Sequence, residues 1–434
     1  MPAADPIELL VAGKYPDPAT GELLGCEARA VAIEESLAGQ ELDLVAGLGL
    51  GSRFAVIGDV DTYAALGERV ASALASRFTV QRIVLPSHPH CDVATIDQIG
   101  AGLDPVDAVI AIGSGTINDL SKMVALARDV PQLVFGTAPS MNGYTSVSAS
   151  VTERGFKRSV RARTPLGVFL DLGVLAAAPK RLIRAGLGDS VCRPTAQTDW
   201  LMSHLLLDTP YSTVPFVLLA DDEPRLFGDA AALVSDTRDT GAMRALARTL
   251  VLSGFGMTLA GGSHPASQGE HLISHYLEMM KPAHLAEAHH GEQIGVAAIV
   301  MAAIQQRVID RDAPLPLAPE TLTRDDVIAH FGPALGETCW RELSAKALDA
   351  ARADAINARV AASWPAIRAR LAATAATPAH IQSILASAGA PTSPADLHYP
   401  DALFATAVAH AREIRDRFTF LDWGRSPLAQ PEPI

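Results

Sequence analysis

Three segments spread along this chain carry side chains that commonly bind a divalent metal ion. One carboxylate and two imidazoles would make a three-ligand set with an open coordination position, which is typical of a catalytic rather than a structural metal site. His271 and His275 are four residues apart on a predicted helix and share one face, so one can bind metal while the other reaches substrate. The segments are Gly188-Asp189-Ser190, Glu270-His271-Leu272-Ile273-Ser274-His275 and His289-His290-Gly291-Glu292.

Each of these side chains has a structural alternative when it is taken singly. Asp189 stands at the predicted start of a helical run, so it could be a helix N-cap. The two histidines of the predicted helix could form an exposed or hydrogen-bonded face, and His289 and His284 compete with His290. The joint occurrence of the three segments, downstream of a nucleotide-binding pattern, favours the metal site.

A Gly-rich turn follows the apolar run Ala108–Ile112 and predicts a site for a pyrophosphate. Gly113 and Gly115 let the backbone turn tightly and approach a phosphate without a Cβ in the way. A helix expected from about Asn118 would add its N-terminal amides and the positive end of its dipole. The third glycine of the common dinucleotide fingerprint is missing, so a plain strand–turn–helix corner is the alternative. The full pattern is Gly113-Ser114-Gly115-Thr116-Ile117-Asn118-Asp119.

Two further features support a nucleotide site. A second loop, Gly136–Ser146, follows the next predicted strand, and loops beyond the carboxyl ends of adjacent parallel strands are where α/β folds bind ligands. Asp59 follows an earlier strand and could accept hydrogen bonds from an adenine ribose. A helix N-cap is the structural alternative for Asp59.

Strands and helices alternate over the first part of the chain. Continuous apolar strands separated by helices indicate a parallel sheet that is covered on both faces. After about Pro179, Ala, Leu and Arg recur at helical spacing and strand-like runs largely disappear. We therefore expect two domains, an α/β nucleotide-binding domain at 1–178 and a helical domain at 179–434. The predicted strands are 53–58, 81–85, 108–112, 132–137 and 168–172, and the predicted helices between them are 62–78, 94–102 and 118–128.

Composition limits the classes of function. A net charge of −13 disfavours nucleic acid and anionic membranes as partners. The four cysteines are scattered without a CxxC pair, which fits a reducing compartment. No apolar run approaches the roughly 20 residues of a membrane helix, and the N-terminus shows no targeting pattern, so a cytoplasmic protein is expected.

Several stretches together resemble the sn-glycerol-1-phosphate dehydrogenase family. This family belongs to the superfamily of iron-containing alcohol dehydrogenases, glycerol dehydrogenases and 3-dehydroquinate synthases. The resemblance runs in order over most of the chain and implies a Rossmann-like N-terminal domain followed by an all-helical C-terminal domain, the dehydroquinate synthase-like architecture. The matching stretches are Gly113–Asp119, Thr137–Ser140, Gly186–Asp189, Pro265–His275 and His290–Glu292.

The resemblance implies a role for each matching residue. It gives Asp189, His271 and His290 as metal ligands, and His275 as a second histidine near the substrate. Asp189 and His275 are expected to act in catalysis and, with Asn142, to contact the substrate. Asn142 stands where these enzymes usually carry an aspartate, which removes a charge from the substrate pocket. After Asp189 the chain has Cys192-Arg193-Pro194, where the resemblance leads us to expect a lysine and a tyrosine. The expected cofactor-binding residues are Asp59, Gly113, Ser114, Gly115, Thr116, Ile117, Asp119, Thr137, Ser140 and, beside the nicotinamide, Ser146.

The implied activity is an NAD- or NADP-linked, metal-dependent interconversion of sn-glycerol-1-phosphate and dihydroxyacetone phosphate, a step of phospholipid metabolism. Zinc, iron and nickel all suit one carboxylate and two imidazoles. A dehydroquinate-synthase-like cyclase and a dehydrogenase of another small polyol or hydroxy-phosphonate are the alternatives. A further alternative is a non-catalytic relic that binds nucleotide without turnover, although the three metal-binding side chains argue against it. The expected partner is a small, phosphorylated substrate, with no nucleic acid or membrane, in a homo-oligomer.

Overall fold

The structure, a computed structural model, describes residues 5–235 and 240–423. The chain forms two compact units, which are described separately. The first comprises Met1–Glu153, Lys157–Ser190 and Thr213–Ser263, and the second comprises Arg154–Phe156, Val191–Ser212 and His264–Ile434. The limits 1–178 and 179–434 follow the change from strands to helices, and as domain boundaries they stay a prediction.

A six-stranded sheet organises the first unit. All neighbouring strands are parallel, in the order β3-β10-β7-β6-β4-β5. The predicted N-terminal α/β sheet is therefore confirmed, and five of its strands lie where the sequence predicts them. The strands are β3 Ala30–Glu34, β4 Arg53–Asp59, β5 Thr79–Leu85, β6 Ala108–Gly113, β7 Gln132–Gly136 and β10 Gly167–Asp171.

The strand that was not predicted is β3. It lies at an edge of the sheet, pairs only with β10, and has only Ile33 fully buried. A short apolar run of this kind does not distinguish a strand from a helix. Two small two-stranded sheets were also not predicted. They are the antiparallel pair of β1 Tyr15–Pro16 with β2 Leu23–Leu24, and β8 Ser148–Glu153 with β9 Phe156–Arg161.

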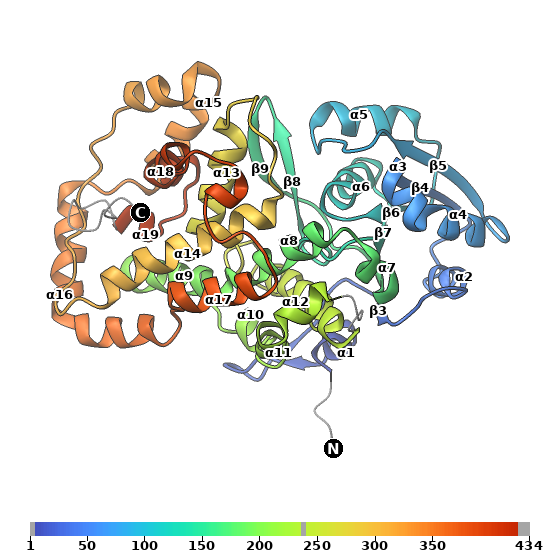
Figure 1. Cartoon of the computed structure of the whole chain (residues 1–434), viewed down its shortest axis with the longest axis horizontal. Helices are drawn as coiled ribbons and strands as arrows, with labels where there is room; N and C mark the ends of the chain where they lie inside the picture. Colours follow the sequence, from blue (N-terminus) through green and yellow to red (C-terminus); the bar gives the residue numbers. More distant parts are fainter. Residues whose placement is uncertain (1–4, 236–239, 424–434) are drawn as a thin grey trace. The chain divides into compact units, whose positions relative to one another are not determined.

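Helices cover both faces of the sheet, which explains the continuous apolar runs of its central strands. Every residue of β6, β7 and β10 is buried. On one face, alternate strand residues form a core with side chains of α2 (Glu41–Ala46) and α4 (Glu68–Ala75). Helix α6 (Gly115–Arg128) packs on the other face, beside α5 (Val93–Gly102) (Figure 1).

The helix that follows the Gly-rich turn begins earlier than predicted. It starts at Gly115 rather than near Asn118, with Ser114 as its N-cap, because the turn itself forms the first helical turn. The other described helices of this unit are α1 Pro6–Val11, α3 Val60–Thr62, the π-helical turn η1 Tyr63–Gly67, α7 Leu172–Ala177, α8 Lys180–Val191, α10 Val214–Val217, α11 Asp222–Gly228, the 3-10 turn η2 Ala230–Val234 and α12 Thr240–Leu259.

In the second unit, every named element that lies wholly within it is a helix, so the predicted helical C-terminal region is confirmed. Helices α13 and α14 pack closely in its core, where a Cβ at Gly269 would lie 2.4 Å from Met301 Cε. The helices are α9 Arg193–Leu207, α13 Gly269–Met280, α14 His290–Ile309, α15 Arg324–Lys346, α16 Ala350–Ala372, α17 Pro378–Ser387, η3 Ala395–Leu397, α18 Asp401–His410, η4 Ala411–Ile414 and α19 Phe420–Trp423.

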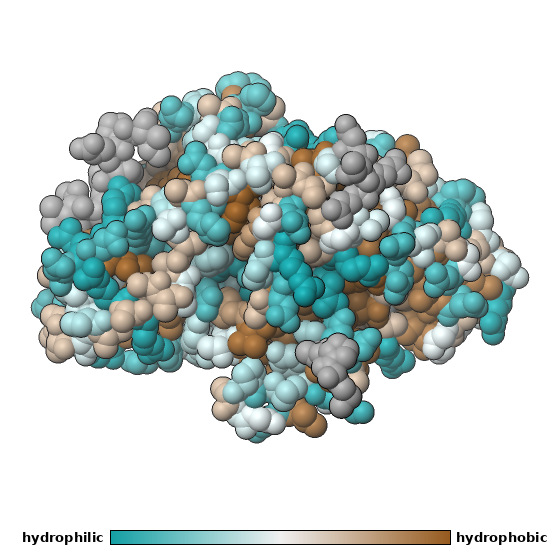
Figure 2. Space-filling model, turned by 60° about the horizontal axis from the view of Figure 1, so that its bottom comes forward, coloured by the Kyte–Doolittle hydropathy of each residue, from teal (hydrophilic) through white to brown (hydrophobic). Residues whose placement is uncertain are grey.

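The surface is mixed in character. Figure 2 shows hydrophilic residues interspersed with hydrophobic ones on the face in view. In the part of the chain that the structure describes, no helix combines the length and the apolar character that a membrane crossing requires.

Candidate active site

Three histidine side chains of the second unit lie together. His271 and His275 come from one face of α13, as predicted, and His290 opens α14. The ring centroids are 6.1 Å apart for His271 and His275, 5.2 Å for His271 and His290, and 5.5 Å for His275 and His290. Both α13 histidines are buried, whereas His290 is partly exposed. The packing of α13 against α14 therefore produces a cluster of imidazoles from two separate sequence segments.

His289 and His284, the two alternatives to His290, have other positions in the structure. His289 is the N-cap of α14, and its main-chain N–H donates to Glu292 Oε2 at 2.8 Å in a capping box. His284 is exposed. Of the three histidines that the sequence left open, His290 is the one that joins the α13 pair.

A carboxylate holds the Nδ1 atom of two of the three rings. His271 Nδ1 lies 3.1 Å from Glu270 Oε1, and His290 Nδ1 lies 3.1 Å from Glu278 Oε1. Ser274 Oγ also contacts His290 Nδ1, at 3.2 Å. A carboxylate at Nδ1 fixes the proton on that atom and leaves Nε2 as the electron-pair donor, the arrangement found around metal-binding histidines. The donor set of this unit therefore fits a divalent ion.

These supporting carboxylates were not predicted from the sequence. Glu270 is fully buried, and its Oε1 accepts a hydrogen bond from Gln268 N at 2.8 Å. Asp199, on α9, accepts hydrogen bonds from Gly269 N and Phe420 N, each at 3.0 Å. Burial, with a contribution from the charge of Glu270, raises the pKa of Asp199 to about 8. This shift favours the neutral form of the Asp199 carboxyl, which would limit the negative charge buried beneath α13.

Two groups of possible ligand atoms lie wholly within this unit. In each group the atoms are within 4.8 Å of one another. The groups are His275, Glu278 and His290, and Cys192, Glu270 and His271. The unit therefore offers sulfur, nitrogen and oxygen donors around the same histidines.

Asp189 belongs to the first unit and lies near the C-terminal end of α8. The helix-cap alternative for it is wrong, because α8 begins at Lys180. Its Oδ2 accepts a hydrogen bond from Asn142 N at 2.8 Å, and its Oδ1 is also buried. A Cβ at Gly186 would lie 1.7 Å from Pro139 O, so α8 packs directly on the loop after β7. That Asp189 joins the histidines in one ligand set stays a prediction.

The two predicted cofactor loops lie side by side in the first unit. Thr137 N donates to Gly113 O at 3.2 Å, and the hydroxyls of Ser114 and Ser140 are in contact. A Cβ at Gly113 would lie 2.5 Å from Ile117 Cβ, so this glycine is required by packing. A Cβ at Gly115 would meet only Met141 Cγ, at 3.2 Å. Gly115 is therefore the glycine whose space a ligand could use.

The order of the strands gives an independent reason to place a ligand here. The chain leaves β4 for β5 on one side, and it leaves β6 for β7 on the other. The direction of winding therefore reverses between β4 and β6, whose carboxyl ends carry Asp59 and Gly113. Open α/β sheets bind ligands at this switch point.

Comparison with known proteins identifies the family of this chain. Residues 32–179 match the family described as iron-containing alcohol dehydrogenase. A glycerol-1-phosphate dehydrogenase of the NAD(P)+ type from Geobacillus stearothermophilus is 31% identical over 379 residues, which cover 85% of this chain and 85% of the relative. The chain belongs to the glycerol-1-phosphate dehydrogenase family of the iron-containing alcohol dehydrogenases.

One further relative supports this assignment, and one solved structure shares the fold. A glycerol-1-phosphate dehydrogenase from Bacillus licheniformis is 32% identical over 286 residues, covering 64% of this chain and 71% of that one. The crystal structure of a probable glycerol dehydrogenase from Sinorhizobium meliloti 1021 has the same fold, with a TM-score of 0.59 and 18% identity over 93% of this chain and 94% of that one. The protein is thus an oxidoreductase of an NAD(P)-dependent dehydrogenase family that acts on small molecules.

In this dehydrogenase, the loop after β7 carries the two residues that the resemblance associates with substrate and nicotinamide. The Asn142 side chain is buried, and its Nδ2 has no hydrogen-bond partner among the described residues. Ser146 is also buried, and its hydroxyl donates to Ser148 O at 3.1 Å. A buried amide donor without a partner is costly, and a ligand oxygen would satisfy it.

The structure assigns a structural role to two of the predicted cofactor residues. Asp59 Oδ1 accepts from Thr62 N at 2.8 Å and caps α3, as the structural alternative had it. Asp119 Oδ2 accepts from Ser150 N at 2.8 Å and so holds β8. Their roles toward a cofactor stay predictions. Thr116 is exposed, whereas Ile117 is buried and could offer only its main chain to a ligand.

One departure from the family pattern has no structural explanation. Cys192, Arg193 and Pro194 stand where the resemblance suggests a lysine and a tyrosine. Arg193 opens α9 and is buried, and Pro194 is accommodated in the first helical turn. Nothing in the structure shows what this change does to the substrate.

Proposed function

We propose that this dehydrogenase interconverts sn-glycerol-1-phosphate and dihydroxyacetone phosphate, with NAD as coenzyme and one divalent ion. Asp189, His271 and His290 hold the ion. The observation that carries the proposal is the pair of imidazoles whose Nδ1 atoms are each held by a carboxylate, at 3.1 Å in both cases. When bound, the ion supplies Lewis acidity at the substrate oxygen, and the nicotinamide accepts or returns a hydride.

The residues of the chain bind and orient the reactants. Main-chain N–H groups at the start of α6 bind the pyrophosphate, since a helix N-terminus favours anions. The Asn142 Nδ2 donor contacts an oxygen of the substrate. His275 takes up or returns the proton of the substrate hydroxyl as general base or acid. The carboxylate of Asp59 disfavours the 2′-phosphate of NADP, which is why NAD is proposed.

Substrate preference is tested with a panel. Glycerol, both glycerol phosphates, dihydroxyacetone phosphate and related phosphonates are assayed with NAD(H) and with added zinc, iron or nickel. We expect turnover of glycerol-1-phosphate. If a metal-loaded protein that binds NAD turns over nothing in the panel, the proposed substrate is wrong and only the family assignment stands.

Asn142 favours a second candidate, a dehydrogenase of another small hydroxy compound. An amide cannot replace a carboxylate as a strong acceptor for hydroxyl groups. A charge-assisted hydrogen bond is worth about 1.5–3 kcal/mol, or roughly ten- to a hundredfold in preference. Asn142→Asp should therefore raise activity on glycerol-1-phosphate if this position limits it. If the wild type is already efficient and Asn142→Asp does not help, the second candidate loses its support.

The fate of the coenzyme distinguishes the proposed dehydrogenase from a cyclase of the dehydroquinate synthase type. A cyclase regenerates its NAD within each cycle, whereas the proposed enzyme accumulates NADH with a simple polyol phosphate.

The ligand assignment is tested on the metal itself. His271→Ala should lose bound metal and nearly all turnover while remaining folded, because Lewis-acid stabilisation is worth several kcal/mol. His284→Ala, at an exposed histidine, is the matched control. Elemental analysis of both variants decides, and equal metal content with retained activity would rule His271 out.

A further inference from the structure

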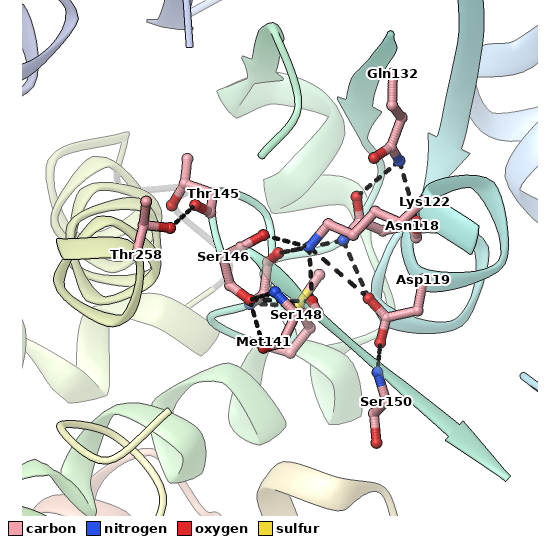
Figure 3. A network of polar contacts seen from close by, with 11 residues as sticks. Asn118, Asp119, Lys122, Gln132, Met141, Thr145, Ser146, Ser148, Ser150 and Thr258 are labelled. Atoms are coloured by element: carbon pink, nitrogen blue, oxygen red, sulfur yellow. Dashed lines mark hydrogen bonds and ion pairs between the residues drawn. The ribbon is translucent and has the colours of Figure 1, made fainter. Parts of the chain in front are cut away.

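A buried lysine holds the loop that carries Asn142 and Ser146. Lys122 lies on α6 and is almost completely buried. Its ammonium donates to three main-chain carbonyls: Gly143 O at 2.7 Å, Ser146 O at 2.9 Å and Ser148 O at 3.1 Å (Figure 3). All three acceptors lie within residues 143–148, so one side chain fixes the short stretch of chain that leads into β8.

Neighbouring side chains of α6 extend the same anchor. Asn118 Nδ2 donates to Gly143 O at 3.3 Å. Asp119 lies 4.0 Å from the Lys122 Nζ atom and binds Ser150 N, just beyond the loop. Gln132 Nε2 donates to Asn118 O at 3.0 Å and holds the asparagine in turn (Figure 3). The helix that begins at the Gly-rich turn is therefore tied to the loop through several contacts, with Lys122 at their centre.

Helix α12 fixes the same loop through other atoms. Thr145 Oγ1 donates to Val251 O at 2.6 Å, and Thr258 Oγ1 donates to Thr145 O at 2.8 Å. A Cβ at Gly254 would lie 2.8 Å from Asn142 O, so α12 approaches the loop backbone closely. The loop is held by two helices, and the contacts of Lys122 are the ones that α12 does not replace.

Core stability alone does not require a lysine at this position. Burying an ammonium is costly, and an apolar side chain of similar size would avoid that cost. The three donors of an ammonium match three main-chain carbonyls, of which Gly143 O and Ser146 O precede β8 and Ser148 O lies in its first residue. The lysine therefore stabilises the conformation of the loop.

We propose that Lys122 is a positioning residue that sets the loop between residues 141 and 148, so that Asn142 and Ser146 face the substrate and the nicotinamide. This inference rests on the proposed function. It predicts that losing the ammonium affects the nicotinamide half of the coenzyme and leaves the adenosine and pyrophosphate half bound, because Gly113 and Gly115 lie outside the loop.

The test compares NADH with ADP-ribose, which lacks the nicotinamide. Dissociation constants are measured for the full-length wild type, Lys122→Met and Lys122→Arg. We expect Lys122→Met to weaken NADH at least tenfold, to leave ADP-ribose within twofold, and to lower kcat at saturating substrate. Lys122→Arg should also weaken NADH selectively, because a planar guanidinium cannot place its donors where the ammonium does.

Lys346→Met is the matched control. Lys346 is also buried, and its Nζ donates to Arg417 O at 2.6 Å and to Asp422 Oδ2 at 2.9 Å in the second unit. Lys346→Met should lower the thermal stability of the protein without changing the ratio of the dissociation constants for NADH and ADP-ribose.

The outcomes separate the inference from the function on which it rests. If Lys122→Met folds and its ratio of NADH affinity to ADP-ribose affinity equals that of the wild type, the positioning role is overturned. If Lys122→Met does not fold, Lys122→Arg decides by the same ratio. Wild type that binds neither ligand overturns the proposed function instead.

Discussion

At the scale of single residues, the partner of each imidazole decides which nitrogen can bind metal. His271 has Glu270 at its Nδ1 atom, whereas His290 has both Glu278 and Ser274. The Nδ1 atom of His290 therefore keeps a hydroxyl contact if its carboxylate partner is removed.

This difference predicts unequal effects of removing the two carboxylates. Glu270→Gln should weaken metal binding about 10- to 100-fold, as is usual for the groups that support metal-binding histidines. Glu278→Gln should have a smaller effect, because Ser274 remains. Competitive chelator titration measures both, with the exposed Glu287→Gln as control. Equal affinity in all three variants would falsify the supporting role of Glu270.

The burial of Lys122 should make the unfolding free energy of the protein depend on pH. Burial lowers the pKa of the Lys122 ammonium from 10.5 to about 8, although the charges of Asp119 and Cys91 act in the opposite direction. Between these pH values the folded protein has released a proton that the unfolded chain still holds. The unfolding free energy therefore rises with pH across this window, and the contribution is lost as pH falls through 8.

We accordingly expect wild type to gain stability relative to Lys122→Met between about pH 8 and 10.5, by at most about 3 kcal/mol. Denaturant unfolding of both proteins at several pH values measures the difference, and titrations shared by the two proteins cancel. A difference that does not change with pH contradicts the assignment.

At this scale, sequence reasoning identified residues that can be recognised from their immediate neighbours in the chain. His271 and His275 are recognisable by helical spacing, and Gly113 by its place after an apolar run. Glu278, Asp199 and Lys122 were missed because their partners are distant in sequence or are backbone atoms of a loop. Only Glu270 offered a signal, since it directly precedes His271.

At the scale of elements, the turn between β6 and α6 contains two glycines with different reasons to be there. A Cβ at Gly113 would lie 2.5 Å from Ile117 Cβ, whereas a Cβ at Gly115 would lie 3.2 Å from Cγ of the flexible Met141 side chain. The two should therefore respond differently to substitution.

Gly113→Ala should lower the unfolding free energy by about 1–3 kcal/mol, the usual cost of overpacking a core. Gly115→Val should reduce the affinity for NADH and ADP-ribose much more than the stability, because its side chain occupies the space of the phosphate. Thermal unfolding and fluorescence titration of both variants test this. Unchanged affinity in Gly115→Val would mean that the turn is only structural.

The elements themselves were predictable where burial was complete. Strands β6 and β7 are covered on both faces and appear in the sequence as uninterrupted apolar runs. Strand β3 and the β8–β9 pair were missed because they are partly exposed, and β3 also depends on pairing with the distant β10.

At the scale of the whole molecule, the net charge of −13 opposes the approach of a phosphorylated substrate. Salt screens this repulsion over a Debye length of about 10 Å at 0.1 M. We expect kcat/KM for glycerol-1-phosphate to rise between about 10 and 150 mM salt, with no such rise for uncharged glycerol. A fall with salt would show that local positive charge at the site outweighs the overall charge.

At this scale, the sequence alone does not predict which segments of the chain make up each compact unit. Thr213–Ser263 has helical periodicity like the rest of the C-terminal half, yet it packs in the first unit. Periodicity reports which face of a helix is buried, and it does not report which neighbour covers that face.

The pairing of β3 with β10 has a consequence for how the protein is made. Ala30 pairs with Gly167, so an N-terminal strand waits for a partner that the ribosome adds about 140 residues later. At 5–20 residues per second, this delay is on the order of ten seconds. During that time the hydrogen-bonding edge of β3 is open to other nascent chains. We therefore expect slower translation before residue 171 to increase co-translational aggregation, and chaperones that shield unpaired strands to relieve it.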